Sequence, residues 1–327
     1  MPAIPEKLGA AYYRGFLTPQ GQLAYDRMQD QLLRGDYKGE AVFPAGPGAV
    51  TADDCFAAYQ ALRDDHPEYF YLGFSSAFSC RGGEGILRYP ILYAPETIRR
   101  IQRQLRISLC RLVRGTAPLP LVEREILVYR RLACQLDYCN HNDVRDHNIV
   151  GPVLLSSGVC EGHNALLLLC FRRIGIPCIK VYGKSRRDRG HCWTIAWIHG
   201  DPVHCDVTWD RAEDGLVRFD YLNLSDARIS GDHYAYQGAA VPPCPSEAWS
   251  YYRYRRLEVS SYPALRSRLR ADAARDRFPI LLHFRYTPAS GDYLEETRRA
   301  LAAERMGGGC QLLCNPEQKN VAVRRVP

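Results

Sequence analysis

The sequence predicts an α+β protein in three parts, and three patterns along the chain lead to this prediction. Apolar residues recur at helical spacing in much of residues 1–117. In residues 118–235, an apolar helix is followed by short strand-like segments separated by turn residues. Residues 236–327 contain a connector and then a strand, a helix and two more strands. The length of 327 residues fits two or three structural units, or one large domain with appendages.

The composition is that of a globular protein, and it excludes several classes. Charged residues make up 24% of the chain, and the longest apolar run, Ala165–Phe171, is far shorter than the roughly 20 residues of a membrane-spanning helix. The formal charge is +7, but the basic residues are spread along the chain, so nucleic acid is not an expected partner. The first residues contain no apolar stretch typical of a secretory signal.

The cysteines indicate a reducing compartment. There are 13 of them, an odd number, and they are scattered from Cys55 to Cys314. A disulfide framework is therefore not expected, and we expect the protein to be cytoplasmic.

Two helices and one strand are predicted for the first 93 residues. Thr18 before Pro19 is typical of a helix start, and Gly35 of a helix end, which predicts a helix over 19–34. Thr51 with Asp54 resembles a capping box, which predicts a second helix from there to the turn at 64–68. A strand over 86–93 would contain Pro90, so we expect it at a sheet edge.

The sequence of the middle part of the chain predicts three more helices and a hairpin. Helical spacing over 98–112 and 122–136 precedes a polar loop over 137–150. The segment 160–173 is apolar all round, which indicates a buried helix. Strand-like segments follow over 179–182, 191–198 and 203–209, and the turn residues at 199–202 join the last two into a hairpin.

The C-terminal part predicts a small β-α-β-β unit. An arginine-rich, helix-like stretch over 263–275 comes first. The unit itself has a strand over 280–286, a helix over 292–306, and strands over 310–314 and 320–326.

The order of Cys160, His191 and Asp206 suggests thiol chemistry. Cys160 begins the buried helix, where the free backbone N–H groups and the helix dipole lower a thiol pKa. If His199-Gly200 is the hairpin turn, His191 and Asp206 are diagonal neighbours on one face, about 7–8 Å apart at Cβ. A turn at Gly200-Asp201 would keep the shared face but lengthen this distance. A nucleophile, a base and a group that orients the base are the parts that such catalysis needs.

The same residues carry a resemblance to a known family. The segments GVCEGHNALLLLCFRRIGIPCIKVYG, GHCWTIAWIHGDPVHCDVTWD and FDYLNLSDARISGDH resemble the transglutaminase-like superfamily of cysteine-dependent acyl-transfer enzymes. The upstream DVRDHNIVG, AYYRGFLTPQGQLAYDRM and ALRDDHPEYFYL resemble other parts of bacterial members. The resemblance implies a papain-like core, in which a buried helix headed by the nucleophile packs on an antiparallel sheet. It implies Cys160 as nucleophile, His191 as general base and then acid, and Asp206 as the residue that orients His191.

Further residues are candidates for the oxyanion hole and for substrate binding. Asn148, or the loop over 146–148, could supply a second oxyanion donor beside the Cys160 backbone N–H. His163 stands where the family usually has Tyr, and Cys192-Trp193-Thr194 departs from the usual Ala-Trp-Asn, so the substrate lining differs there. Packing is the default role for Trp193 and Trp209, with a groove wall as the alternative.

The basic segment before His191 also has two interpretations. Residues 184–190, which include Arg186 and Arg187, could be a solvated loop. They could instead form a basic lip that favours acidic substrates.

The leading function is acyl transfer on the amide bonds of a peptide or protein substrate, without a cofactor or metal. Water or a primary amine could resolve the acyl-enzyme, and we favour hydrolysis. One alternative is a non-catalytic module that keeps the fold. A weaker one is a zinc site, since zinc takes Cys and His ligands, built from Cys160, His163, His191, Cys192, His204 and Cys205. The sequence predicts no oligomeric state.

Overall fold

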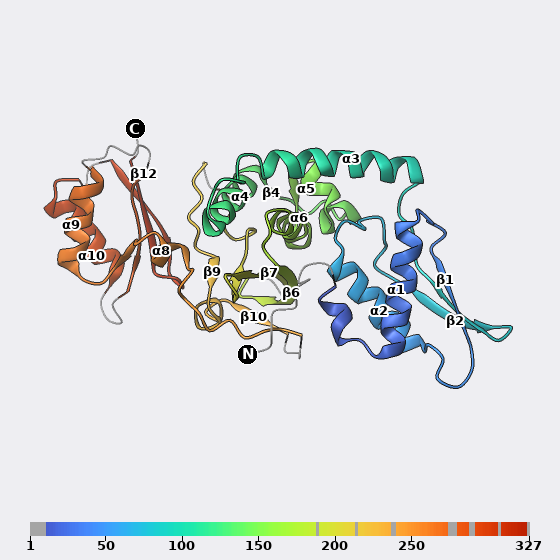
Figure 1. The fold of residues 1–327 in the computed structure, drawn as a ribbon. Coiled ribbons are helices and arrows are strands. Elements are labelled where there is room, and N and C mark those ends of the chain that lie inside the picture. Colours follow the sequence, from blue (N-terminus) through green and yellow to red (C-terminus); the bar gives the residue numbers. More distant parts are fainter. Residues whose placement is uncertain are drawn as a thin grey trace.

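The computed structural model describes residues 11–187, 190–212, 215–236, 240–273, 280–287, 292–306 and 309–325. The predicted α+β class is confirmed (Figure 1). No helix of the described residues is long and apolar enough to span a membrane. The helices are η1 Tyr13–Phe16, α1 Pro19–Leu33, α2 Ala52–Asp65, α3 Pro95–Leu112, α4 Leu121–Gln135, η2 Val144–His147, α5 Val150–Leu154, α6 Cys160–Arg173, α7 Asp226–Ile229, α8 Tyr251–Tyr254, α9 Tyr262–Ala273 and α10 Tyr293–Ala303.

The strands form four sheets. The first is β1 Glu40–Pro44, β3 Glu84–Arg88 and β2 Ala77–Arg81, in that order. The central sheet is β10 His233–Ala235, β6 Cys178–Ser185, β7 His191–Ile198, β8 Asp201–Cys205 and β9 Leu222–Leu224. The third is β11 Glu258–Val259, β12 Ile280–Tyr286, β14 Asn320–Arg325 and β13 Cys310–Asn315, and the last pairs β4 Asp137–Tyr138 with β5 Ser157–Gly158.

The first two helices begin at the N-terminal caps that the sequence predicts. The Thr18 side chain accepts the Gly21 N–H at 2.9 Å, with Pro19 at the first helical position of α1. Thr51 and Asp54 form a complete capping box at the start of α2. Each cap satisfies N–H groups that have no partner inside the helix.

The strand predicted over 86–93 differs from the observed one. β3 ends at Arg88, before Pro90, and lies between β1 and β2 instead of at the sheet edge. A strand with partners on both sides has no place for a residue without an N–H, so the ladder stops before the proline. The N-terminal region therefore contains a three-stranded sheet as well as its helices.

Helix α6 lies inside the protein, between the central sheet and other helices. Figure 1 shows α3, α4 and α5 on one side of α6, and β6, β7 and β10 on the other. The α6 residues Leu166, Leu167 and Phe171 are fully buried and belong to one core with Ala196 and Ile198 of β7. That core also contains residues of α1 and α2. The all-round apolar pattern of this segment thus predicted its burial correctly.

The hairpin of β7 and β8 has the predicted register. Thr194 pairs with Cys205 and Ile195 with His204. The two turn residues, His199 and Gly200, both have positive φ, at 50° and 96°, as a type I′ turn requires. β8 ends at Cys205, so Asp206 is the first residue after the strand rather than part of it.

The C-terminal unit has the predicted β-α-β-β order and a core of its own. α9 and α10 pack with its sheet around Leu265, Leu269, Phe284 and Leu301. β11 adds a parallel strand that the sequence did not predict. The division at 1–117, 118–235 and 236–327 stays a prediction.

Gly183 offers a test of the packing in the central sheet. A Cβ there would lie 2.4 Å from the Tyr234 carbonyl oxygen and 2.7 Å from the Trp193 ring. We expect Gly183→Ala to lower the free energy of unfolding by about 1–3 kcal/mol, because backbone and ring must both shift. Urea denaturation measures this change.

Gly15→Ala is the matched control, because no atom lies within 4 Å of a Cβ built there. It should change the stability by less than about 0.5 kcal/mol. Equal stability of the two variants would contradict the packing described for Gly183.

Candidate functional site

Helix α6 begins at Cys160 because the preceding loop packs against its first turn. The Val159 N–H donates to the Asp146 carbonyl at 3.0 Å. A Cβ at Gly162 would lie 2.6 Å from the Asp146 carbonyl oxygen and 2.8 Å from that of Asn148, so glycine is required at this contact. The first N–H groups of a helix have no partner inside it. The Cys160 thiol therefore lies at the positive end of the helix dipole, which favours a thiolate.

The structure brings Cys160, His191 and Asp206 together. His191 is the first residue of β7, and Asp206 follows β8 directly. The His191 Nε2 and Asp206 Oδ2 atoms are 2.6 Å apart. A hydrogen bond also joins the side chains of His191 and Cys160. Since Asp206 engages Nε2, the other ring nitrogen, Nδ1, is the one that serves the thiol.

These contacts shift all three pKa values toward the charged forms. Hydrogen bonds from Cys192 and His191 lower the pKa of Cys160 to about 5, although burial opposes this shift. Burial lowers the pKa of His191, but the charge and hydrogen bond of Asp206 outweigh it and raise the pKa to about 10. Burial also disfavours the charged form of Asp206, yet His191 and His233 hold the pKa of this carboxyl well below its usual range. A thiolate facing an imidazolium is therefore the favoured state at neutral pH.

Asp206 has a partner for each oxygen. Oδ1 accepts the Thr208 N–H at 2.8 Å. Oδ2 contacts His191 and also His233 Nε2, which is 3.0 Å away. His233 was not predicted as a site residue. Its one signal in the sequence is that it ends the segment FDYLNLSDARISGDH, which follows the hairpin and resembles the family.

Asn164 is a second residue that sequence reasoning missed. It lies in α6 one turn after Cys160 and is fully buried. Its Nδ2 lies 3.0 Å from the carbonyl oxygens of both Cys160 and Cys192, and its Oδ1 accepts the Thr194 hydroxyl at 3.2 Å. One amide side chain thus joins the helix of the thiol to the strand of the imidazole.

Trp209 and Arg187 lie at the accessible side of the site. The half-buried Trp209 ring is 5.9 Å from the His191 ring, and the exposed Arg187 guanidinium is 4.5 Å above the Trp209 ring. Arg186 is bound elsewhere, since its guanidinium pairs with Glu317 and donates to the Gly231 carbonyl. Of the predicted basic lip, Arg187 is therefore the residue placed at the site, while residues 188 and 189 lie outside the described part of the chain.

Trp193 and His163 lie in the core rather than on the substrate side. Trp193 is fully buried, stacks on His191 from within, and donates its Nε1–H to His204 Nδ1 at 2.9 Å. His163 is fully buried beside the Asp137 carbonyl, and burial lowers its pKa to about 4. The burial of Trp193 agrees with packing, the default role predicted for it, because other side chains cover its face of the sheet.

The Asn148 side chain is engaged within the scaffold. Its Oδ1 accepts the Val150 N–H at 2.8 Å, and its Nδ2 points toward the Phe70 carbonyl at 3.5 Å. Both ends of the amide thus have partners, which disfavours the predicted role as an oxyanion donor in this arrangement.

The residues of the zinc alternative do not form one centre. Within the described ranges, the close groups of ligand atoms are His191, Asp206 and His233, and separately His204, Asp226 and Cys244. The imidazole nitrogens of both groups already have partners. His191 contacts Cys160 and Asp206. His233 contacts Asp206 and Asp232, and His204 contacts Trp193 and Asp226. This leaves no ring lone pair for a metal in the arrangement observed.

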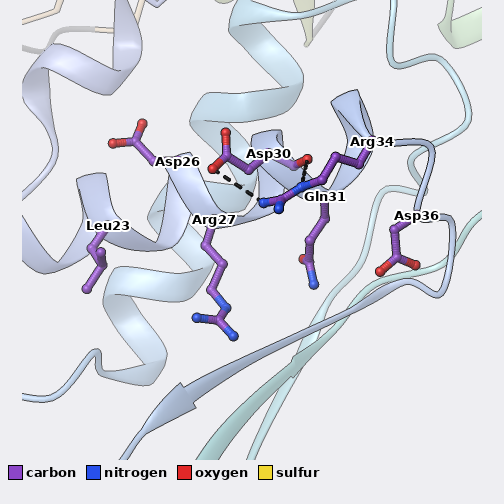
Figure 2. Close-up of a pocket in the computed structure, with 7 residues that line it drawn as sticks. All are labelled: Leu23, Asp26, Arg27, Asp30, Gln31, Arg34 and Asp36. Atoms are coloured by element: carbon purple, nitrogen blue, oxygen red, sulfur yellow. Dashed lines mark hydrogen bonds and ion pairs between the residues drawn. The ribbon is translucent and has the colours of Figure 1, made fainter.

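Two surface hollows differ in their relation to the site. The one in Figure 2, lined by Leu23, Asp26, Arg27, Asp30, Gln31, Arg34 and Asp36, contains none of the site residues. A smaller hollow begins at Glu161, next to Cys160, and reaches Lys180 and Arg63. Its charges are largely paired, with His147 Nδ1 2.7 Å from Glu161 Oε2 and Lys180 Nζ 3.0 Å from Asp64 Oδ1.

Comparisons with known proteins give structural neighbours. No family model and no curated protein matches the sequence. The chain is similar to a solved transglutaminase, with 12% identity and a TM-score of 0.26 over 42% of this chain and 45% of the other. It is also similar to a proposed cysteine protease from Cytophaga hutchinsonii, with 12% identity and a TM-score of 0.29 over 44% of this chain and 65% of the other. This chain spans less than two thirds of the length of either neighbour.

The pKa of Cys160 gives a direct prediction for labelling. Iodoacetamide reacts with thiolates, and an unassisted thiol ionises near pH 8.5. We expect the alkylation rate of Cys160 to rise with pH through a midpoint of about 5, because hydrogen bonds stabilise its thiolate. Peptide-resolved mass spectrometry measures this rate, with the exposed Cys80, Cys110 and Cys134 as internal controls.

At pH 6, labelling should be confined to Cys160. Replacing His191 by Gln should move the midpoint upward, because the thiolate loses its cationic partner. A midpoint near 8.5 in the unaltered protein would show that the thiol is not activated.

Asn164 gives a prediction for stability. Asn164→Ala removes the partner of the buried Cys192 carbonyl and of the Thr194 hydroxyl. We expect a loss of about 2–4 kcal/mol in the free energy of unfolding, since each unsatisfied buried group costs about 1–3 kcal/mol. Thermal or urea denaturation measures it.

Gln104→Ala, at an exposed position of α3, is the control and should be close to neutral. If both variants unfold alike, Asn164 does not join α6 to β7 as described.

Proposed function

We propose that the protein is a cysteine-dependent acyl-transfer enzyme with a papain-like core, acting on amide bonds of a peptide or protein substrate. One observation carries this proposal. The Cys160 thiol, at the start of a buried helix, is hydrogen-bonded to an imidazole that a buried carboxylate holds at 2.6 Å. Nucleophile, base and orienting group are thus in the relation that thiol catalysis requires.

In the first half of the proposed reaction, the Cys160 thiolate attacks the carbonyl carbon of the amide. The new S–C bond turns the carbonyl oxygen into an oxyanion. When the C–N bond breaks, the amine leaves with the proton carried by His191, and a thioester on Cys160 remains. Asp206 keeps the imidazole oriented and stabilises its charge throughout.

The proposed oxyanion donors are backbone groups. The N–H groups of Cys160 and its neighbours in the first turn of α6 have no partner inside the helix. Such fixed dipoles stabilise charge where it develops in the transition state. The loop over 146–148 holds this turn in place through its packing against Gly162.

In the second half, a water molecule attacks the thioester. Neutral His191 takes one proton from the water, the C–S bond breaks, and the carboxylic acid and the thiolate–imidazolium pair result. Cys160 is partly exposed, so solvent can reach the thioester. We therefore propose hydrolysis as the outcome, with a primary amine as the alternative acceptor.

The proposed substrate surface is formed by Trp209 and Arg187. Trp209 contacts the rings of both His191 and His233, and Arg187 stacks on its outer face. An aromatic ring with a guanidinium stacked on it suits a substrate with an acidic group near the scissile bond.

All thirteen cysteines are free, which supports a reducing compartment such as the cytoplasm.

A peptide library tests the proposed function. Incubation with the protein and a primary amine, followed by mass spectrometry, is expected to give hydrolysed peptides, because water reaches the thioester. Cys160→Ala should abolish the products. Peptides joined to the amine would identify a transferase instead, and unchanged peptides together with an inert Cys160 would favour the non-catalytic module.

A further inference from the structure

Two imidazoles meet on the same oxygen of Asp206. His233 Nε2 lies 3.0 Å from Oδ2, the atom that His191 Nε2 approaches to 2.6 Å. His191 begins β7 and His233 begins β10, and these strands pair with opposite edges of β6. Gly183 of β6 lies opposite His191 in one ladder and opposite Ala235 in the other. The two rings approach across β6 to 5.1 Å between centroids.

The second nitrogen of His233 also faces a carboxylate. His233 Nδ1 is 2.6 Å from Asp232 Oδ1, and the Tyr221 hydroxyl donates to Asp232 Oδ2 at 2.5 Å. His233, Asp206 and Asp232 are each 1% exposed or less. An ionised carboxylate only accepts hydrogen bonds. With both carboxylates ionised, both ring nitrogens of His233 donate, which makes this ring an imidazolium between two carboxylates.

We propose that His233 is a positioning residue, which fixes the Asp206 carboxylate and shares its negative charge with His191. This inference rests on the proposed function, since its consequence lies in the proton transfer that His191 performs. It assigns a role to His233 and Asp232 beyond the Cys160, His191 and Asp206 set.

Sharing the carboxylate limits how tightly His191 holds its proton. The cation on His233 offsets part of the Asp206 charge and also repels a proton on His191. Without His233, Asp206 would act on His191 alone, and the pKa of His191 would rise further. A more tightly held proton passes less readily to the leaving amine, because general acids work best with a pKa near the operating pH.

The charged and titratable surroundings of His233 come from several elements. Asp206 and His191 face it from the hairpin, Asp232 precedes it, and Tyr221 approaches from the segment before β9. His204 interacts with it electrostatically from the same face of the sheet, and Arg187 lies beyond Trp209. Burial lowers the pKa of His233, but Asp206 and Asp232 outweigh burial and raise it. This agrees with the charge state that the hydrogen bonds require.

The experiment compares His233→Gln, Asp232→Asn and unaltered protein by pH-jump alkylation of Cys160. Iodoacetamide is applied for a short time at each pH, so that labelling precedes unfolding. The rate of Cys160 alkylation is plotted against pH, and the alkaline limb of this profile is the change that occurs where His191 loses its proton. It is expected at about pH 10 in unaltered protein. His233→Gln should move this limb upward by about one unit, because a neighbouring cation is lost. Asp232→Asn should move it in the same direction by less, because His233 then loses one of the carboxylates that keep it charged.

His204→Gln is the matched control. His204 is a buried histidine on the same face of the sheet, bonded to Trp193 and Asp226 rather than to Asp206. Its replacement should lower stability without moving the limb. An unmoved limb in His233→Gln, or an equal movement in His204→Gln, would overturn the role of His233. Since alkylation needs no substrate, this outcome is independent of whether any peptide is cleaved.

The peptide assay supplies the second readout. If the unaltered protein cleaves peptides, His233→Gln should lower kcat by about 10- to 100-fold while KM changes little. This loss is smaller than the roughly 10²–10⁴-fold that general acid–base catalysis contributes, because His191 itself remains. A change confined to KM would also contradict the proposed role. Failure of the unaltered protein to act on any peptide would refute the proposed function and leave the alkylation result standing.

Discussion

The site depends on keeping one charged carboxylate in the protein interior. A buried, unpaired carboxylate is strongly disfavoured, so Asp206 requires its donors. The His191 imidazole reaches Asp206 from β7 and the His233 imidazole from β10. The third donor is the Thr208 N–H, in the chain just after β8. Removing one partner of such a group leaves the charge uncompensated. The segments that carry the site are therefore coupled through this carboxylate. Asn164 couples them a second time, because it bonds the carbonyls of Cys160 and Cys192.

The hairpin shows how much of the site could be predicted from the sequence. A two-residue turn fixes the register of its strands, and a register fixes which side chains share a face. The turn residues left two positions for the turn, and either one puts His191 and Asp206 on one face. The observed pairing of Thr194 with Cys205 is that of the His199-Gly200 turn. The start of α6 could be predicted in the same way, because Gly158 and an apolar run mark it locally.

The rest of the site depends on contacts between segments far apart in the chain. His233 reaches Asp206 because β10 pairs with β6, and no turn signal sets that register. Trp193 was expected to pack, but its partners Tyr12, Tyr13 and Cys244 come from remote segments. The predicted strand at 86–93 was placed at an edge because of Pro90, whereas pairing with both β1 and β2 ends it at Arg88. In each case the local pattern was sound and the tertiary partner was missing.

The charge of His191 at neutral pH tests the central claim most directly. Nitrogen-15 NMR of histidine-labelled protein reports whether one or both ring nitrogens carry a proton, and His191→Gln identifies the resonances. The hydrogen bonds with Asp206 and Cys160 predict an imidazolium that persists up to about pH 10. A neutral His191 ring at neutral pH would contradict the ion pair between Cys160 and His191.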